Sequence, residues 1–335
     1  MSITKAILTG GGHATRLRPI TTNLNKHLIP LANKPMIFHA IEKAVEAGVT
    51  DIFINTNPGE TQLQKIVGDG SKWGIKIKYF EQAGGPQGIA HVVKCAEEFV
   101  GNDPFMFYLS DNIILASLKP LFKKFDEENL DCLIALSKVP DPERFGVPRF
   151  GTKGELVEVL EKPTNPPSDF AVTGIYLFSS NYFKAFATIQ KSARGEYEIP
   201  SIFNYFLQNG YKMDYQEITG WWKDTGKPDD LILANKLLMD TMLLDESKTK
   251  VGSSTSIGNN VKLQGPIIIG DNCMLENCTV GPYAAIGAGS SIKNVNISNS
   301  IVFENSEVSF PPVIEHGIIG SVAHIINGAS SESRT

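Results

Sequence analysis

Short apolar runs and segments with helical spacing alternate along the first hundred residues of this 335-residue chain. The apolar runs are rich in β-branched and aromatic residues and predict strands at 6–9, 51–57, 75–82 and 105–112. Between them, apolar residues spaced by three and four predict helices near 37–45, 60–67 and 88–99. Strands that alternate with helices are typical of an α/β fold with a doubly wound, mostly parallel sheet. Ligands of such a sheet bind beyond the carboxyl ends of its strands, so we expect the loops at 9–19, 82–88 and 109–112 to meet there.

From Val251 onward the hydrophobic pattern changes to a period of six residues. Apolar residues stand at 251, 257, 263, 269 and 275, and after a one-residue slip at 280, 286 and 292. Glycine follows several of them, which is typical of the hexapeptide repeats of a parallel β-helix. Three hexads make one coil, so this stretch supplies a little over two coils, and the segment to about Ile326 adds another coil or a cap. We therefore predict domains at 1–244 and 245–328, with a disordered tail at 329–335.

Composition and charge narrow the class of protein. With 42% hydrophobic and 20% charged residues, the chain can bury a sizeable core. The net charge of -5 and the lack of a Lys or Arg block argue against a nucleic-acid or membrane partner, so we expect any anionic ligand to be small. The four cysteines show neither zinc-site nor disulfide spacing, and no signal peptide or long apolar span is found. We expect a soluble, cytoplasmic protein.

The stretch GGGHATRLRP at 10–19 follows the first predicted strand. Glycine-rich turns between a strand and a helix present backbone N–H groups to phosphate, and Arg16 and Lys26 add positive charge. The stretch lacks the GK[ST] of a Walker loop and the acidic residue that follows a dinucleotide-binding GxGxxG. It therefore predicts a phosphate site, with a purely structural turn as the alternative. Further cations at Arg18 and Lys34 favour the phosphate site.

These motifs resemble the signature of the sugar-1-phosphate nucleotidylyltransferases, GGxGTRLxPxT followed by K, P and KP. This chain carries LTGGGHATRLRPIT and NKHLIPLANKPMI. The resemblance continues through QAGGPQGIAH, LSDN, EKP, VTGIY, RGEYEI and WWKDTG and covers nearly all of the first 240 residues. It is most similar to the long glucose-1-phosphate thymidylyltransferase branch. The resemblance implies a Rossmann-like nucleotidyltransferase sheet followed by a short left-handed parallel β-helix.

The resemblance implies nucleotidyl transfer from dTTP to glucose 1-phosphate. An oxygen of the sugar phosphate attacks the α-phosphorus of the nucleoside triphosphate, and pyrophosphate leaves. The attacking oxygen is already anionic near neutral pH, so the reaction needs positioning and charge neutralisation rather than a general base. The implied cofactor is Mg²⁺, held by Asp111 and Asp224, because Mg²⁺ prefers carboxylate, water and phosphate oxygens.

The resemblance also assigns binding residues. Arg16 and Lys26 are expected to neutralise the triphosphate, and Lys162 and Arg194 to bind the phosphate of the sugar, with Arg144 as a weaker candidate. The nucleotide is expected to contact Leu8, Gly11, Gly12, Thr15, Arg16, Gln82 and Gly88. The hexose is expected to contact Gly146, Glu161 and Gly174, while Glu196 is either a further hexose contact or an exposed surface residue.

Two residues depart from the family pattern. Ala14 stands where the pattern has glycine, and a positive φ there would cost about 1 kcal/mol. Ser110 replaces the glycine of LGDN, and QAGGPQG is one residue longer than its counterpart, so the floor beneath the base is expected to differ. The choice between dTTP and UTP therefore stays open. His13, Trp221 and Trp222 are interpreted as loop or core residues.

Other classes of function stay open at this point. Ala14 and Ser110 leave room for a sugar-nucleotide sensor without catalysis, although the retained basic and acidic residues favour an enzyme. Hexapeptide solenoids also form acyltransferases, but the repeat here is short and holds only His316 and His324. We favour homo-oligomerisation or allosteric communication as the role of the β-helix, because an exposed solenoid face offers a flat surface to a second subunit.

Overall fold

The computed structural model describes residues 2–12, 14–82, 84–244 and 248–320 in full, together with the backbone of 323–326 and 329–332. His13 lies outside the described residues, as do 245–247 at the predicted domain border and 333–335 of the predicted tail at 329–335. Residue contacts divide the chain into two compact units: the first comprises 1–12 and 38–223, and the second comprises 13–37 and 224–335. The predicted border at 245 does not coincide with this division, and the assignment of domains at that border stays a prediction.

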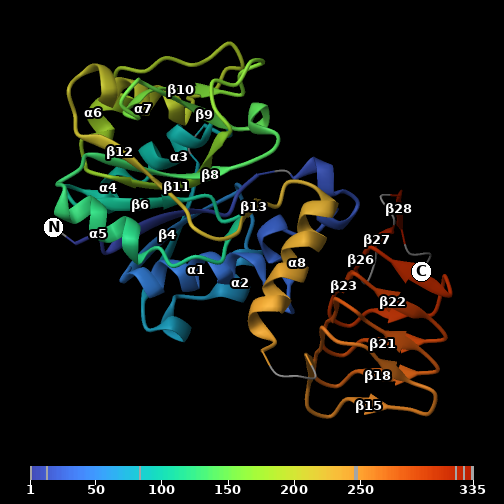
Figure 1. Cartoon of the computed structure of the whole chain (residues 1–335). Coiled ribbons are helices and arrows are strands. Elements are labelled where there is room, and N and C mark those ends of the chain that lie inside the picture. Colours follow the sequence, from blue (N-terminus) through green and yellow to red (C-terminus); the bar gives the residue numbers. More distant parts are fainter. Residues whose placement is uncertain are drawn as a thin grey trace. The chain divides into compact units, whose positions relative to one another are not determined.

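A seven-stranded sheet forms the centre of the first unit (Figure 1). Its strands, in spatial order, are β12 (Met213–Glu217), β8 (Cys132–Lys138), β11 (Phe170–Phe178), β6 (Phe105–Tyr108), β1 (Lys5–Thr9), β4 (Asp51–Thr56) and β5 (Lys76–Glu81). All neighbours are parallel except β11, which runs antiparallel to both β8 and β6. The predicted mostly parallel sheet is therefore confirmed. One strand is shorter than predicted, because the chain turns at residues 109–111, directly after β6.

Helices cover both faces of this sheet, as a doubly wound fold requires (Figure 1). They are α1 (Met36–Ala47), α2 (Gln62–Val67), α3 (Ile89–Cys95), α4 (Glu97–Val100), α5 (Lys119–Glu127), α6 (Tyr182–Phe186) and α7 (Ile199–Gln208). An aromatic-rich core fills the space between the sheet and helices α3, α6 and α7. Phe105 and Phe178 of the sheet pack there against Tyr182 and Phe203, and all four are fully buried. This core fixes α3, whose N-terminus borders the site described below.

Short elements connect the main strands and helices. They are β2 (Pro30–Leu31), β3 (Lys34–Pro35), β7 (Asn112–Ile114), β9 (Gly146–Phe150), β10 (Leu156–Glu161) and β13 (Trp222–Asp224), with 3-10 turns at Thr15–Leu17, Ile20–Thr22, Lys26–Leu28, Ser71–Trp73 and Pro142–Arg144. Strands β9 and β10 pair as an antiparallel ladder that brings Glu161 opposite Gly146. The last residue of β10 is therefore placed by its partner strand.

The C-terminal part of the second unit is a left-handed parallel β-helix with three faces. The first face holds β14 (Thr249–Val251), β17 (Ile267–Ile269), β20 (Ala284–Ile286), β23 (Ser300–Val302) and β26 (Gly317–Ile319). The second face holds β15 (Ser256–Ile257), β18 (Met274–Glu276), β21 (Ser291–Lys293) and β24 (Glu307–Val308). The third face holds β16 (Lys262–Leu263), β19 (Thr279–Val280), β22 (Asn296–Ser298) and β25 (Val313–Glu315). The described strands make four coils and the start of a fifth. The segment after 292 thus adds more than one coil. The chain then reverses in β27 (Ala323–Ile326) and β28 (Ala329–Glu332), which pair antiparallel.

The inner column of the β-helix confirms the period read from the sequence. Val251 pairs with Ile269, Ile269 with Ile286, and Ile286 with Val302, at spacings of 18, 17 and 16 residues. Ile269, Ile286 and Val302 are buried in one apolar core. Val251 is 38% exposed because β14 is the edge strand of its sheet and has a coil on one side only.

Helix α8 (Pro228–Met242) covers one outer face of the β-helix within the second unit (Figure 1). Tyr283 Oη donates to Asp240 Oδ1 at 3.1 Å, and His316 Nε2 lies 3.0 Å from Asp229 Oδ1. Asn33 Nδ2 donates to the Ile286 carbonyl at 2.6 Å. Helix α8, the segment 13–37 and the coils therefore form one unit, which the hydrophobic pattern does not predict.

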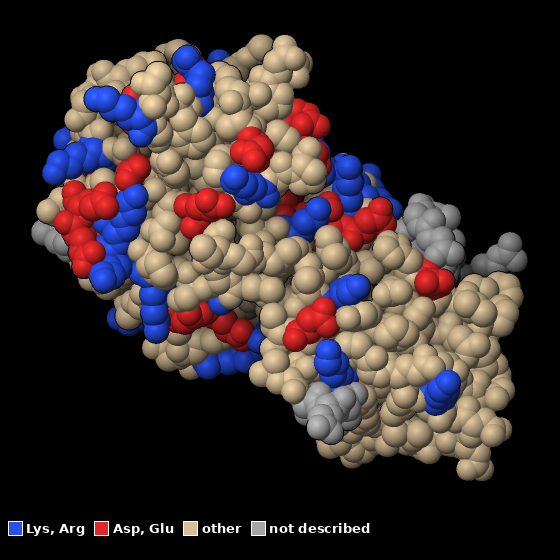
Figure 2. Space-filling model, in the orientation of Figure 1, with Lys and Arg blue, Asp and Glu red and all other residues tan. Residues whose placement is uncertain are grey.

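No helix among the described residues is long and apolar enough to cross a membrane. On the face of the molecule drawn in Figure 2, Lys and Arg side chains intermingle with Asp and Glu. All four cysteines are free thiols, and three of them are buried.

Candidate active site

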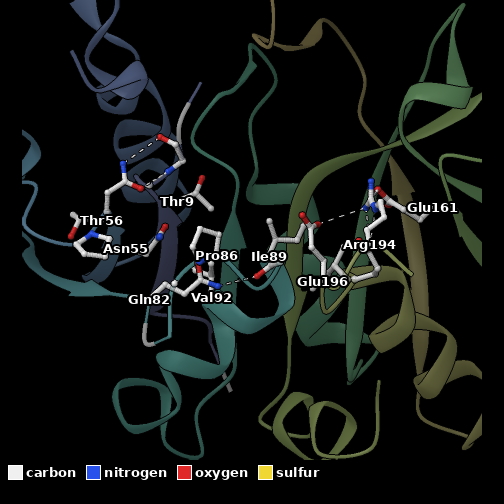
Figure 3. A pocket seen from close by; sticks show the side chains of 18 of the residues that line it. Thr9, Asn55, Thr56, Gln82, Pro86, Ile89, Val92, Glu161, Arg194 and Glu196 are labelled. Carbon is white, nitrogen blue, oxygen red and sulfur yellow. Dashed lines mark hydrogen bonds and ion pairs between the residues drawn. The ribbon is translucent and has the colours of Figure 1, made fainter. Parts of the chain in front are cut away.

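A cavity of about 320 Å³ lies in the first unit, beyond the carboxyl ends of β1, β4 and β5 (Figure 3). Its lining comprises Thr9, Gly11, Gly12, Asn55, Thr56, Asn57, Pro58, Gln82, Gly85, Pro86, Gly88, Ile89, Val92, Glu161, Lys162, Arg194, Glu196, Glu198 and Ile199. Asn55, Thr56 and Gln82 lie at one end of this cavity, and Glu161 and Arg194 lie at the other. The loops at 9–12 and 82–88 meet here as predicted, whereas residues 109–112 do not line the cavity.

The glycine loop after β1 is held by two asparagines at the end of β4. Gly10 N donates to Asn55 Oδ1 at 3.0 Å, and Gly12 N donates to Asn57 Oδ1 at 2.8 Å. Glycine is needed because a Cβ at Gly10 would lie 2.6 Å from the Asn55 carbonyl oxygen, and Gly12 has a φ of 115°. The sequence suggested that this loop offers its amides to phosphate. The structure shows a different use for two of its three glycine amides. The amides of Gly10 and Gly12 donate to the side chains of Asn55 and Asn57, which the sequence analysis did not single out.

The loop between β5 and α3 forms the neighbouring wall. Gly88 has a φ of 93°, and a Cβ there would lie 2.6 Å from the Tyr197 carbonyl oxygen. Gln82 Nε2 donates to the Gly88 carbonyl at 3.2 Å and lies 3.1 Å from His91 Nδ1. The Gly88 backbone therefore binds the Gln82 side chain through its carbonyl oxygen. Only glycine fits at position 88, because any Cβ would clash with Tyr197.

The far end of the cavity is a cluster of opposite charges. Arg194 Nη2 lies 2.8 Å from Glu198 Oε1 and 3.3 Å from Glu161 Oε1, while Lys162 Nζ also lies 3.3 Å from Glu161 Oε1. The hydrogen bond with Glu198 is the main reason that the pKa of the Arg194 guanidinium is raised above its ordinary value. Glu196 Oε2 is 3.8 Å from Arg194. Three carboxylates thus surround two cations, so this end can both accept from hydroxyl groups and attract an anion.

Lys162 adopts an uncommon backbone conformation at this end. Its φ is 45°, in the left-handed region, where a non-glycine residue is strained. Its N–H donates to the Phe145 carbonyl at 2.9 Å. The conformation follows directly on β10 and turns the chain at the edge of the cavity.

Asp111 follows β6 in the turn at 109–111, outside the lining of the cavity. Trp222 Nε1 donates to Asn112 Oδ1 at 3.0 Å, and Asn112 Nδ2 donates to Asp111 Oδ1 at 3.0 Å. Gly174, with a φ of 76°, lets β11 pass close by, since a Cβ there would lie 3.0 Å from Asn112 Nδ2. Trp222 is therefore a buried structural residue, as predicted, and it helps to orient the Asp111 carboxylate. Ser110 is fully buried, and its N–H donates to Thr9 Oγ1 at 2.9 Å.

The second unit contains the remaining candidates. Around Gly226, a Cβ would lie 3.1 Å from Asp224 Oδ2 and 3.4 Å from Arg16 Nη2, so the carboxylate and the guanidinium converge on this glycine. Thr15 and Arg16 belong to the 3-10 turn Thr15–Leu17, and Lys26 begins another. Ala14 has a φ of 43°, the positive value considered from the sequence. This turn therefore carries the strain of a methyl group where glycine would relax it.

Of the predicted binding residues, the structure brings seven together around the cavity: Gly11, Gly12, Gln82, Gly88, Glu161, Lys162 and Arg194. Leu8 is fully buried in β1, while Gly146, Gly174 and Asp111 lie outside the cavity lining. The weaker candidate Arg144 is paired with Asp141 at 2.5 Å.

Sequence reasoning missed Asn55, Asn57 and Glu198. Two asparagines at the end of an apolar strand were the available signal for the first pair.

A doubly wound sheet with a polar cavity at its carboxyl edge defines a small-ligand α/β enzyme. The nucleotidyl transferase family model matches residues 5–241, and the chain belongs to this family. Among its relatives is the low-salt glycan biosynthesis nucleotidyltransferase Agl11 of Haloferax volcanii, which is 36% identical over 96% of this chain and 93% of that protein. A glucose-1-phosphate thymidylyltransferase of Streptomyces griseus is 34% identical over 94% of this chain and 92% of its own length.

A solved structure extends the comparison to three dimensions. It is a Bacillus anthracis protein described as a glucose-1-phosphate thymidylyltransferase, in complex with sucrose. The two share 39% identity with a TM-score of 0.66, and the match covers 70% of this chain and 94% of that chain. The fold and family expected from the sequence motifs are confirmed.

Proposed function

We propose that the protein is a glucose-1-phosphate thymidylyltransferase that converts dTTP and glucose 1-phosphate into dTDP-glucose and pyrophosphate. The observation that carries this proposal is the cavity with two unlike ends in a chain of the nucleotidyl transferase family. An amide and glycine backbone stand at one end and suit a base, whereas carboxylates and cations at the other suit a sugar phosphate. The names of relatives that span more than nine-tenths of this chain support the same substrate pair.

The residues divide between base, hexose and phosphate. Gln82 and Gly88 would hold the base, and Gly11, Gly12 and Thr15 the remainder of the nucleotide, with Leu8 supporting from β1. Glu161 would accept from the hexose hydroxyls, near Gly146 and Gly174. Lys162 and Arg194 would orient the phosphate of the sugar so that its oxygen attacks the α-phosphorus in line.

Charge at the hexose end limits what Lys162 and Arg194 can do alone. The two cations face Glu161, Glu196 and Glu198, which leaves this cluster with a formal charge of -1. A sugar phosphate therefore needs further positive charge. We assign that charge to Arg16 and Lys26 and to a divalent cation, which would offset the charge that accumulates on the α-phosphate in the transition state.

Asp111 and Asp224 would hold this cation, which we propose to be Mg²⁺. Their oxygens suit a hard cation that keeps several waters and takes the rest of its ligands from phosphate. Asn112 Nδ2 donates to the Asp111 carboxylate in the first unit, and in the second unit the Asp224 carboxylate lies beside Arg16 and Gly226. Among the described residues there is no group of three or more His, Cys, Asp or Glu side chains that could hold a metal ion. When bound, Mg²⁺ would supply charge to the reacting phosphates.

A turnover matrix tests the proposal. Pyrophosphate release is measured for dTTP, UTP, dCTP and GTP, each with glucose, galactose and mannose 1-phosphates and Mg²⁺. We expect the highest kcat/KM for dTTP with glucose 1-phosphate. A higher value for UTP would make the enzyme a uridylyltransferase. Nucleotide binding without release of pyrophosphate in any mixture would instead identify a non-catalytic sensor.

We further propose that the enzyme works in the cytoplasm as a homo-oligomer. The support is the β-helix, whose flat coils offer an extended surface to a second copy. Sedimentation of the full chain should give a mass above the 36.6 kDa of one chain. A monomer at assay concentration would reject the assembly role.

A further inference from the structure

The amide of Gln82 is held from behind by two neighbours. Its Nε2 lies 3.2 Å from the Gly88 carbonyl oxygen and 3.1 Å from His91 Nδ1. A carbonyl oxygen can only accept, so the amide must turn its NH₂ toward Gly88; the reversed amide would set two acceptors against each other. No hydrogen bond from the described residues reaches Gln82 Oε1. This oxygen is therefore the amide atom that remains for a ligand in the cavity that Gln82 lines.

The two hydrogens of the NH₂ group define the state of His91. One is donated to Gly88, and the other points to His91 Nδ1, which must then accept. Neutral imidazole with its hydrogen on Nε2 satisfies this geometry, whereas the imidazolium would set an N–H against the NH₂. The position of a single proton on His91 is thus linked to the orientation of the Gln82 amide.

The surroundings of His91 favour the neutral ring. His91 stacks on Tyr197, with ring centroids 6.1 Å apart and planes at 19°, and it also faces Phe186. Burial, followed by the charge of Lys191, lowers the pKa of His91 below its ordinary value of 6.5. The other titratable groups facing the ring are Tyr197 and Cys95, whose Sγ is 3.7 Å from Nδ1. Lys191 itself lies over the ring of Tyr197.

We propose that His91 is a positioning residue that sets the choice of base by fixing the Gln82 amide. The proposal deepens the proposed function, since it rests on Gln82 being the base-binding residue. With Oε1 directed to the ligand, the site accepts from the N3–H of thymine or uracil. Cytosine presents an unprotonated N3 at the same place, so two acceptors would face each other and the base is rejected.

Acid should weaken this selection. As the pH falls through the lowered pKa of His91, Nδ1 gains a proton and opposes the Gln82 NH₂. The amide then loses one of its two anchors and can present its NH₂ to the cavity. The preference for dTTP over dCTP should therefore be full near pH 8 and decline below about pH 6.5.

Equilibrium binding gives the first test. The Kd values of dTTP and dCTP are measured by calorimetry without sugar phosphate at pH 8 and pH 5.5. For the wild type, we expect the dCTP/dTTP ratio of Kd values to be lower at pH 5.5 than at pH 8, by at most roughly fivefold to tenfold, as expected for the loss of one hydrogen bond. His91→Phe keeps an aromatic ring beside Tyr197 but removes the acceptor, so its ratio should be low and independent of pH. Lys94→Gln is the matched control, because Lys94 lies on the same helix but pairs with Glu97, and it should behave like the wild type.

The proton on His91 can be observed directly in the wild-type protein. Long-range ¹H–¹⁵N spectra of the imidazoles, with the His91 signals assigned through His91→Phe, should show a protonated Nε2 and a bare Nδ1 at pH 7. A protonated Nδ1 would overturn the proposal, as would a base preference that His91→Phe leaves intact. These readouts do not need turnover. If the protein released no pyrophosphate in the turnover matrix but showed the expected tautomer and Kd ratios, the proposed reaction would be wrong and the role of His91 in base selection would be supported.

Discussion

The cavity of the first unit and the β-helix of the second unit are built by opposite rules. Around the cavity, Asn55, Gln82 and Arg194 come from segments far apart in the chain. In the β-helix, each buried residue stacks on another 16 to 18 positions away, as Ile269 does on Ile286. Charged side chains are also sparser over the coils in the view of Figure 2. The stacking of the β-helix therefore follows from a local repeat, whereas the cavity depends on contacts between distant segments that no local pattern encodes.

The largest expected effect comes from removing a single carboxylate charge. Asp111→Asn and Asp224→Asn should each lower kcat by roughly 1,000-fold or more, because the proposed cation loses an anionic ligand and the transition-state charge is no longer offset. Thermal unfolding should stay within a few degrees of the wild type. Asp103→Asn, which removes only an exposed ion pair with Lys5, is the control and should keep full turnover. Wild-type rates in either site variant would take the metal out of the mechanism.

The next effect concerns the backbone of the β-helix. Gly281 has a φ of 105°, and a Cβ there would lie 1.8 Å from the Gln264 carbonyl oxygen. Gly281→Ala should therefore lower the free energy of unfolding by about 3 kcal/mol or more through clash and strain. Gly101→Ala, at a positive φ with no atom within 4 Å, should cost only about 1 kcal/mol. Calorimetric unfolding of both variants measures the two losses of stability. Equal losses would show that the close contact with the Gln264 carbonyl does not determine the cost of a side chain at position 281.

A smaller effect is expected where α8 holds the segment 13–37. Asn235 is fully buried, and its Oδ1 accepts from Ala32 N at 2.7 Å. Asn235→Leu should cost about 1–3 kcal/mol, because the Ala32 N–H is left buried without an acceptor. Asn209→Leu, at an exposed helix end, is the control. If chemical denaturation gave the two variants equal stability, this hydrogen bond would not contribute to the second unit.

The smallest effect concerns Ala14. Because its φ is 43°, Ala14→Gly should raise the free energy of unfolding by about 1 kcal/mol or less. Turnover should be nearly unchanged, since the side chain itself contributes only a methyl group. A loss of stability in this variant would mean that the positive φ is not strained here.

Much of the fold could be predicted from the sequence because it follows from local periodicity. The strands and helices around β1, β4 and β5 and the inner column of the β-helix appear where the hydrophobic pattern predicts them. The antiparallel direction of β11 could not be predicted from that pattern, because the alternation of strands and helices does not encode strand direction. The grouping of segment 13–37 with the coils was beyond it too, because it depends on side-chain contacts such as Asn33 to Ile286.

The candidate site divides in the same way. The family resemblance assigned Gln82 to the base, Glu161 to the hexose and Arg194 to the sugar phosphate, and the structure places all three side chains on one cavity. The resemblance did not predict that Asn55 and Asn57 occupy the amides of Gly10 and Gly12, because polar residues at a strand end carry no sign of their partner. The roles assigned to these residues in binding and catalysis stay predictions until they are measured.

The central claim is that one cavity holds the base against Gln82 and Gly88 and the hexose against Glu161 and Arg194. A crystal structure of the full chain with dTDP-glucose tests this most directly. We expect thymine within hydrogen-bond distance of Gln82 Oε1 and glucose hydroxyls within hydrogen-bond distance of Glu161. A product bound in the reverse direction, or outside this cavity altogether, would contradict it.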